Sequence, residues 1–169
     1  LLCTAISIRH KIARWPAVLA CLSLFAVLLW QPWSAAYTPN QLALTAIDVG
    51  QGDSLLVVFP EGCTMLIDGG GILSYGKMRR PNMDIGEDVV SPYLWSRGFR
   101  HLDIVAATHA HADHTGGLLA ILRNFHPSEV WLGPNPLAEL VAEARNLGIA
   151  VKDVRAGQPF PLAGATVEV

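Results

Sequence analysis

The segment 108–117 concentrates side chains that bind metal ions. It reads THAHADHTGG and places His109, His111, Asp113 and His114 within six positions. Neutral imidazoles and a carboxylate are ligands of Zn²⁺, and also of Mn²⁺ or Fe²⁺ when oxygen ligands and water complete the coordination shell. Two such ions about 3.5–4 Å apart lower the pKa of a bound water, which becomes a nucleophile near neutral pH. These residue types and their spacing therefore predict a divalent-metal site, for Zn or Mn, at which two ions could share a hydroxide for hydrolysis.

The remaining ligand-type residues do not suggest a second metal site. His10, His101 and His126 each stand alone, and we interpret them as surface residues. The chain has only 3 cysteines, which are scattered, so a disulfide framework and a thiolate metal site are excluded. The segment 108–117 is therefore the candidate metal site of this sequence.

The elements around this segment predict an α/β domain over residues 41–169. Apolar runs at 42–49 and 54–59 indicate strands joined by a tight Gly50-Gln51-Gly52 turn. We expect further strands at 63–67, 103–108, 129–132, 149–154 and 166–169, and helices at 87–95, 117–124 and 137–146. The strand at 103–108 would deliver the chain to His109, where a loop lets the ligands converge. Hairpins followed by alternating strands and helices predict sheets covered by helices rather than an all-β barrel.

Residues 1–40 have the pattern of a membrane segment. The run WPAVLACLSLFAVLLW at 15–30 carries no charge, and we predict a transmembrane helix at about 15–33, followed by a linker to residue 40. The apolar stretch 1–8 suits the end of a preceding span. Basic residues flank the predicted helix on its N-terminal side only, at Arg9, Lys11 and Arg14, so the positive-inside rule places that turn in the cytoplasm and the later residues outside. A secretory signal peptide with cleavage near Ser34-Ala35-Ala36 is the alternative, and it also exports the domain.

Composition and charge narrow the function classes. With 51% hydrophobic and 15% charged residues, the chain is not an intrinsically disordered one. Residues 41–169 hold nine basic and fourteen acidic side chains, a net charge of −5. This balance argues against a generally basic nucleic-acid-binding domain.

The His-x-His-x-Asp-His pattern resembles the signature of the metallo-β-lactamase fold. Its context is similar to the C-terminal domain of ComEC-type competence proteins, which are polytopic inner-membrane proteins of DNA uptake. The residues that carry this resemblance, from about residue 42 onward, are D-V-G-Q-G-D-S at 48–54, L-I-D-G-G at 66–70, D-I-G-E at 84–87 and V-S-P-Y-L at 90–94. The implied fold is an αββα sandwich, of which this chain would hold the N-terminal half.

The resemblance also implies roles for individual residues. His109 and His111 would bind the first metal ion, and Asp113 and His114 the second, with Asp113 also orienting the attacking hydroxide. Members of the family often have Asp at the position of His111, and His completes the full hydrolase motif here. Three carboxylates, those of Asp48, Asp53 and Asp68, would lie near the site and fix imidazole tautomers. The alternative for these three is turn capping by Asp beside Gly.

The fold further requires a later His, a bridging Asp and a final His. Only His126 follows the segment 108–117, and it lies too close in sequence to serve. We therefore expect this chain to be a fragment of a longer protein. Residues 1–169 alone would bind metal weakly and turn over no substrate.

ComEC-like context implies DNA as substrate and hydrolysis of its phosphodiester bonds on the outer or periplasmic side of the bacterial inner membrane. Lys77, Arg79 and Arg80 form the one local basic cluster of the domain, and they either contact DNA or lie in a solvated loop. Two alternatives remain open: a membrane-tethered small-molecule metallo-hydrolase, and a non-catalytic domain that guides DNA toward a channel. Other components of the uptake machinery are expected as partners.

Overall fold

A computed structural model describes residues 16, 18–29, 37–72 and 83–169. The chain divides into two compact units, Leu1–Trp33 and Ser34–Val169.

The first unit contains a helix at residues 16 and 18–29. Its apolar side chains are exposed, for example Leu24 at 63%, Phe25 at 60% and Leu29 at 71%. Within the described part of the chain, no helix has both the length and the hydropathy that a membrane span requires. The basic turn at 9–14 and the flanking tryptophans Trp15, Trp30 and Trp33 lie outside the described residues. The transmembrane helix at about 15–33 therefore stays a prediction.

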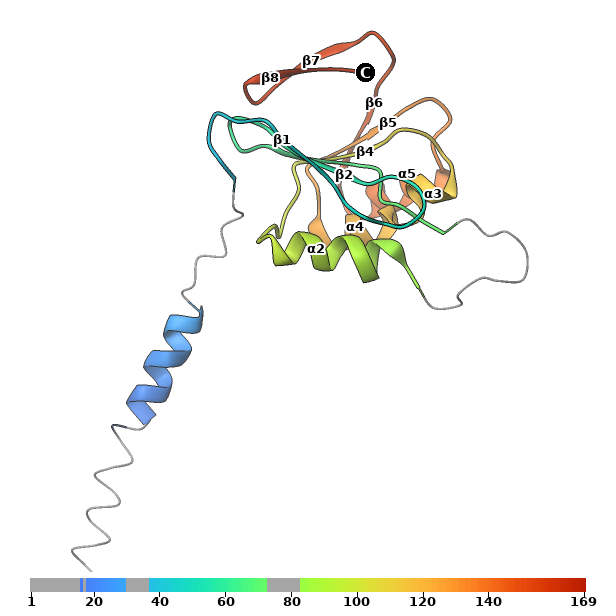
Figure 1. Cartoon of the computed structure of the whole chain (residues 1–169). Helices are drawn as coiled ribbons and strands as arrows, with labels where there is room; N and C mark the ends of the chain where they lie inside the picture. Colours follow the sequence, from blue (N-terminus) through green and yellow to red (C-terminus); the bar gives the residue numbers. More distant parts are fainter. Residues whose placement is uncertain (1–15, 17, 30–36, 73–82) are drawn as a thin grey trace, which may run out of the picture. The chain divides into compact units, whose positions relative to one another are not determined.

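The second unit is built on a six-stranded mixed sheet (Figure 1). The strands follow one another in sequence order: β1 (Ala43–Ala46), β2 (Leu55–Val58), β3 (Thr64–Ile67), β4 (Ile104–Ala107), β5 (Glu129–Leu132) and β6 (Ala150–Asp153). β1, β2 and β3 pair antiparallel, whereas β3, β4, β5 and β6 pair parallel. The predicted strands are confirmed, with most of them one or two residues shorter at their ends.

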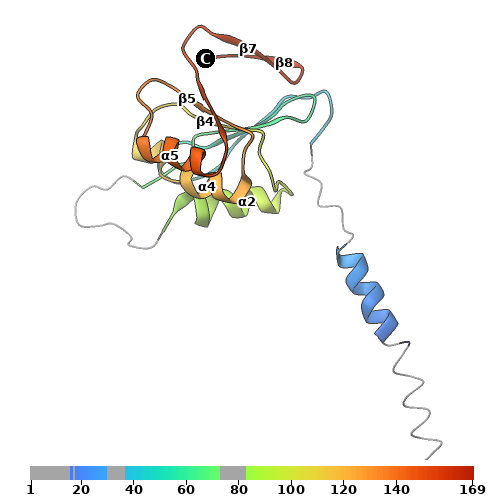
Figure 2. The ribbon, with the colours of Figure 1, turned by 180° about the vertical axis from the view of Figure 1, so that it is seen from behind.

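Helices cover one face of this sheet and a β-hairpin covers the other, as both views show (Figures 1 and 2). The helical elements are the π-helix η1 (Gly86–Val90), α2 (Ser91–Ser96), α3 (Ala112–Thr115), α4 (Leu118–Phe125) and α5 (Ala138–Asn146). The hairpin consists of β7 (Pro159–Leu162) and β8 (Ala165–Glu168), which form a separate two-stranded sheet. The order of layers, helices, sheet and second sheet, confirms a mixed α/β fold.

The inner strands β2, β3, β4 and β5 are buried on both faces, which explains their nearly continuous apolar sequences, whereas most residues of the outer strands β1 and β6 are exposed. On the helix side, Leu66 and Val105 are fully buried in the larger core cluster. On the hairpin side, Met65, Ile104 and Trp131 form the smaller cluster, against which the hairpin packs. Because neighbouring residues of a strand point to opposite faces, one short strand contributes to both clusters.

Helix α4 shows why the helices dock on one side. Its buried residues Leu118, Ile121, Leu122 and Phe125 have the i, i+3, i+4, i+7 spacing of one helical face. The helix ends at His126, which has a left-handed backbone with φ of 42° and whose N–H is bonded to the Leu122 carbonyl. Burial of this apolar stripe anchors the helix that follows the predicted metal-binding segment.

Three elements differ from the sequence prediction. The segment 108–117 is not a continuous loop, because residues 112–115 form α3, which is too short to show helical periodicity. Strand β7 was missed because its two prolines are unfavourable in a sheet interior; β7 pairs only with β8, where proline is tolerated. The helix expected at 87–95 begins as the π-helix η1 and continues as α2, so its first turns differ from an α-helix.

Candidate metal centre

One edge of the sheet gathers the predicted ligands. In the parallel pair β3 and β4, Ile67 lies opposite Ala106, so Asp68 and His109 both follow strands that end at this edge. The backbone N–H of Asp68 donates to the Ala106 carbonyl at 2.8 Å, which extends the pairing beyond β3. Strand β2 runs in the opposite direction and begins at this same edge, just after Asp53. The carboxyl ends of parallel strands are the common location of sites in α/β sheets.

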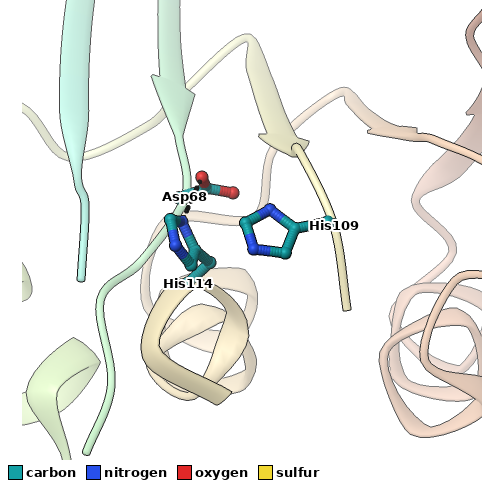
Figure 3. Close-up of side chains that lie close together, drawn as sticks. All are labelled: Asp68, His109 and His114. Atoms are coloured by element: carbon teal, nitrogen blue, oxygen red, sulfur yellow. Dashed lines mark hydrogen bonds and ion pairs between the residues drawn. The ribbon is translucent and has the colours of Figure 1, made fainter. Parts of the chain in front are cut away.

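Asp68, His109 and His114 form the group of side chains that is best arranged for a metal ion among the described residues. Their potential ligand atoms lie within 4.8 Å of one another. Figure 3 shows the two imidazoles beside the Asp68 carboxylate, with His109 beyond the end of β4 and His114 on α3. The ring centroids of His109 and His114 are 4.0 Å apart. The sequence predicted two of these residues as ligands and placed the third near the site.

Asp68 is the buried centre of this arrangement, with 2% of its surface exposed. Its Oδ1 accepts a hydrogen bond from the Thr108 backbone N–H at 2.9 Å, and its Oδ2 accepts one from the Thr108 hydroxyl at 2.6 Å. Oδ2 also lies 2.9 Å from Nδ1 of His114, which donates to it because a carboxylate offers only acceptors. The backbone of Asp68 has a φ of 58°, a left-handed conformation that these bonds help to maintain.

His111 and Asp113 flank the group. His111 is exposed and precedes α3, and its ring lies edge-on to that of His109 with a centroid distance of 4.6 Å. Asp113 has a buried Oδ1 for which the described residues provide no hydrogen-bond partner. Its Oδ2 lies 3.8 Å from Nε2 of His114.

These residues fit a bound divalent cation. An unpartnered buried carboxylate oxygen costs free energy unless a cation or a water satisfies it. The separation of 3.8 Å between Asp113 Oδ2 and His114 Nε2 suits two ligands of one ion, each about 2 Å from the metal. His114 Nε2 retains its lone pair because Nδ1 is the donor to Asp68. Asp113 and His114 could therefore share one metal ion, with the rings of His109 and His111 beside them.

The remaining predicted carboxylates occupy different environments. Asp48 is exposed, and its Oδ1 accepts a hydrogen bond from the Gly50 backbone N–H at 3.1 Å, as in a capped turn. The Asp53 side chain is 69% exposed, and its Oδ2 lies 3.8 Å from His114 Nδ1, too far for a hydrogen bond. The structure therefore brings Asp68 into the group and leaves Asp48 outside it. Lys77, Arg79 and Arg80 lie outside the described residues.

Two glycine segments shape the metal-binding segment through backbone contact. A Cβ on Gly52 would lie 1.8 Å from the carbonyl oxygen of Asp113, and a Cβ on Gly71 would lie 1.8 Å from that of Ala112. Gly52 also has a φ of 84°, which other residues rarely adopt. Only glycine permits this close approach, so the motif at 48–54 and the glycine that directly follows the motif at 66–70 pack beside the segment 108–117.

Two residues at the site were not singled out from the sequence. The Thr108 hydroxyl bonds Asp68 and also lies 2.9 Å from Nδ1 of His109. Ser54 is buried, and its hydroxyl donates to the Asp68 carbonyl at 3.1 Å. Thr108 could have been noticed as the polar residue directly between an apolar strand and the first histidine. Ser54 is the last residue of the motif at 48–54, but its role depends on a partner that lies 14 positions away and is brought close only by the fold.

Comparison with known proteins agrees with the geometry. The chain is 32% identical over 121 residues to ComE operon protein 3 of Bacillus subtilis (strain 168). The match covers 66% of this chain and 16% of that protein, so the chain spans only a small part of this relative's length. The similarity confirms the predicted resemblance to ComEC-type competence proteins.

Solved structures share the fold at low sequence identity. A metallo-beta-lactamase from Cronobacter sakazakii with a mutated HARLDQ motif superposes with a TM-score of 0.52 at 22% identity, covering 73% of this chain and 48% of that one. The metallo-beta-lactamase SMB-1 gives a TM-score of 0.52 at 18% identity, covering 82% and 54%. The family model of the metallo-beta-lactamase superfamily matches residues 47–154, which include every residue of the candidate site. The chain therefore belongs to the metallo-beta-lactamase superfamily.

Proposed function

We propose that this domain hydrolyses phosphodiester bonds of DNA as part of a membrane protein of DNA uptake. The observation that carries the proposal is the group formed by Asp68, His109 and His114, together with Asp113 Oδ1, which has no hydrogen-bond partner in the described part of the chain. Membership of a metal-dependent hydrolase superfamily supports hydrolysis, and the similarity to ComE operon protein 3 supports a role in competence. DNA as the substrate follows from the ComEC-type resemblance.

The residues of the candidate site would bind the metal ions and orient the attacking water. His109, His111, Asp113 and His114 would hold two divalent cations, which would supply Lewis-acid stabilisation of the charge that develops on phosphate oxygens. Asp113 Oδ1 is available to accept a hydrogen bond from the attacking water and so to orient it. Water attacks phosphorus, the bond to one ester oxygen breaks, and that oxygen takes a proton, which leaves a phosphate monoester and a hydroxyl.

Recognition of DNA must overcome the acidity of the domain. With a net charge of −5 over residues 41–169, long-range attraction to phosphate is weak. We therefore assign the contact with the DNA backbone to the local cluster Lys77, Arg79 and Arg80. Neutralising these three residues should weaken DNA binding and reduce its dependence on salt concentration.

Residues 15–33 would anchor the domain in the bacterial inner membrane, with the four-layered αββα hydrolase domain on the outer side. The exposed leucines and phenylalanine of the helix at 18–29 favour an apolar environment for this segment. A reporter enzyme fused after Asn40 should be active only outside the cytoplasm. Activity of the fusion in the cytoplasm would reverse the proposed orientation.

Cleavage is tested with the protein as encoded by its gene, because we expect further metal ligands beyond the segment 108–117. The purified protein is incubated with Mn²⁺ or Zn²⁺ and single-stranded or duplex DNA, and in parallel with a lactone and a thioester. The inactive variant combines His109→Ala with Asp113→Ala. The matched control is His126→Asn, which changes an exposed histidine and retains a residue that tolerates its left-handed backbone.

Each outcome decides between the functions. Cleavage of DNA by the wild type and the control, but not by the double variant, supports the nuclease. Hydrolysis of the small substrates without DNA cleavage identifies a small-molecule hydrolase and refutes the nuclease. DNA binding without hydrolysis of any substrate identifies a guiding domain and also refutes it.

A further inference from the structure

Four polar groups form a continuous hydrogen-bonded chain beneath the candidate metal site. Nδ1 of His109 lies 2.9 Å from the Thr108 hydroxyl, and this hydroxyl lies 2.6 Å from Oδ2 of Asp68. The same Oδ2 lies 2.9 Å from Nδ1 of His114. One carboxylate oxygen is thereby connected to both imidazoles, directly to His114 and through Thr108 to His109.

The directions of these bonds follow from the number of available protons. The carboxylate of Asp68 only accepts, so the single hydroxyl proton of Thr108 lies between Oγ1 and Oδ2. The Thr108 oxygen then faces His109 with a lone pair, and the bond at 2.9 Å requires the proton to be on Nδ1 of His109. If the hydroxyl instead donated to His109, two lone pairs would face each other at 2.6 Å.

The geometry of Thr108 favours a fixed direction. Its backbone N–H donates to Oδ1 of Asp68 while its hydroxyl donates to Oδ2, so one carboxylate holds the residue at two points. Threonine is β-branched, which restricts rotation of the hydroxyl away from this position. A neutral imidazole in water carries its proton mainly on Nε2, so the arrangement must impose the opposite tautomer on His109.

We propose that Thr108 is a positioning residue that fixes His109 in the Nδ1–H tautomer and so leaves Nε2 free to bind a metal ion. His114 receives the same tautomer directly from Asp68. The buried carboxylate of Asp68 thus sets the tautomer of two imidazoles, that of His114 by a direct hydrogen bond and that of His109 through the Thr108 hydroxyl. This inference rests on the metal site of the proposed function but not on DNA or on hydrolysis.

Thr108→Val tests the proposal because valine retains the β-branched shape and removes only the hydroxyl. Thr108→Ser is the rescue variant, since serine restores the hydroxyl. The tautomers are read from ¹⁵N spectra of the metal-free 169-residue chain labelled at histidine, in detergent micelles at about pH 8, where free imidazoles are neutral. His101 is the internal reference, because its Nδ1 lies 3.1 Å from the Phe125 carbonyl, which can only accept.

We expect His109 of the wild type and of Thr108→Ser to carry its proton on Nδ1. In Thr108→Val, His109 should change to Nε2–H, while His114 and His101 remain Nδ1–H. Affinity for Zn²⁺ should fall about tenfold in Thr108→Val and recover in Thr108→Ser, as for other groups that orient metal ligands. Unchanged signals of His114 and His101 show that the variant is folded.

The proposal is overturned if His109 of the wild type is Nε2–H, or if it stays Nδ1–H in Thr108→Val. A failure of the nuclease assay with the expected tautomers would refute the proposed substrate and leave the role of Thr108 intact. Conversely, DNA cleavage with an unchanged tautomer in Thr108→Val would refute the role of Thr108 alone.

Discussion

Replacing Asp68 by asparagine should exchange donor and acceptor in the hydrogen bonds at the Oδ2 position, while the side-chain volume stays nearly the same. An amide nitrogen at the Oδ2 position carries two hydrogens, which match the two partners found there, the Thr108 hydroxyl and Nδ1 of His114. The Thr108 oxygen and Nδ1 of His114 would then both accept a hydrogen bond from the asparagine amide. His114 would become Nε2–H, and Thr108 would donate its proton to His109, which would become Nε2–H as well. The variant keeps its shape but presents two N–H groups where metal ligands are needed.

The magnitudes follow from these two bonds. Hydrogen bonds to a charged group contribute about 1.5–3 kcal/mol and neutral ones about 0.5–1.5 kcal/mol, so the free energy of unfolding should fall by about 2 kcal/mol. Each imidazole must give up one neutral bond, worth about 1 kcal/mol, before its Nε2 binds metal. A total near 2 kcal/mol corresponds to about a 30-fold loss of affinity. This value lies within the roughly 10–100-fold losses known for groups that orient ligands.

The assay measures Zn²⁺ affinity of the 169-residue chain by competition with a coloured chelator, and stability by urea unfolding with EDTA. Asp48→Asn is the matched control, because Asp48 lies at the same sheet edge but is exposed and, among the described residues, bonds only a turn N–H. Asp68→Asn should lose affinity and the control should not. The reasoning is refuted if Asp68→Asn binds Zn²⁺ within threefold of the wild type, or if both variants lose affinity equally.

Three further predictions concern packing and reactivity. Gly52→Ala should lower the thermal midpoint and the metal affinity more than Gly50→Ala, because both glycines have positive φ but only Gly52 would place a Cβ against backbone; equal losses would contradict this. Leu118→Ala, at 0% exposure, should cost about 2–5 kcal/mol in urea unfolding, whereas Leu44→Ala, at 65%, should cost under about 0.5 kcal/mol. Burial and a nearby carboxylate raise the pKa of Cys63 from 9.0 to about 11, and the thiolate is the reactive form. Its alkylation by iodoacetamide should therefore reach half its maximal rate near pH 11, and half-maximal rate near pH 9 would contradict this.

The sequence predicted most of the fold because each element carries its own periodicity. Strand β5 (Glu129–Leu132) was predicted with its observed bounds, and α4 differs by a single residue at each end. The two elements that the sequence did not predict, α3 and β7, have local causes. Four residues are too few for α3 to show a helical period, and the prolines of β7 hide a strand that pairs on one side only.

The site was predictable to the extent that it is local in sequence. His109 and His114 are five positions apart, and their types and spacing alone predicted metal binding. Asp48, Asp53 and Asp68 could not be ranked, because all three are aspartates beside turns. Burial separates them: Asp68 is 2% exposed and the other two are exposed.

The ligand types, their spacing and the strand that ends at His109 can be read from the amino-acid sequence alone. Which carboxylate bonds the histidines depends on how the strands pair in three dimensions. Thr108 and Asp68 are 40 positions apart, and they meet because the parallel register of β3 and β4 places the ends of both strands side by side. The tautomer expected for His109 depends on the hydrogen bond between Thr108 and Asp68. A pairing shifted by one residue would turn the Asp68 side chain to the opposite face of the sheet and break the chain of hydrogen bonds.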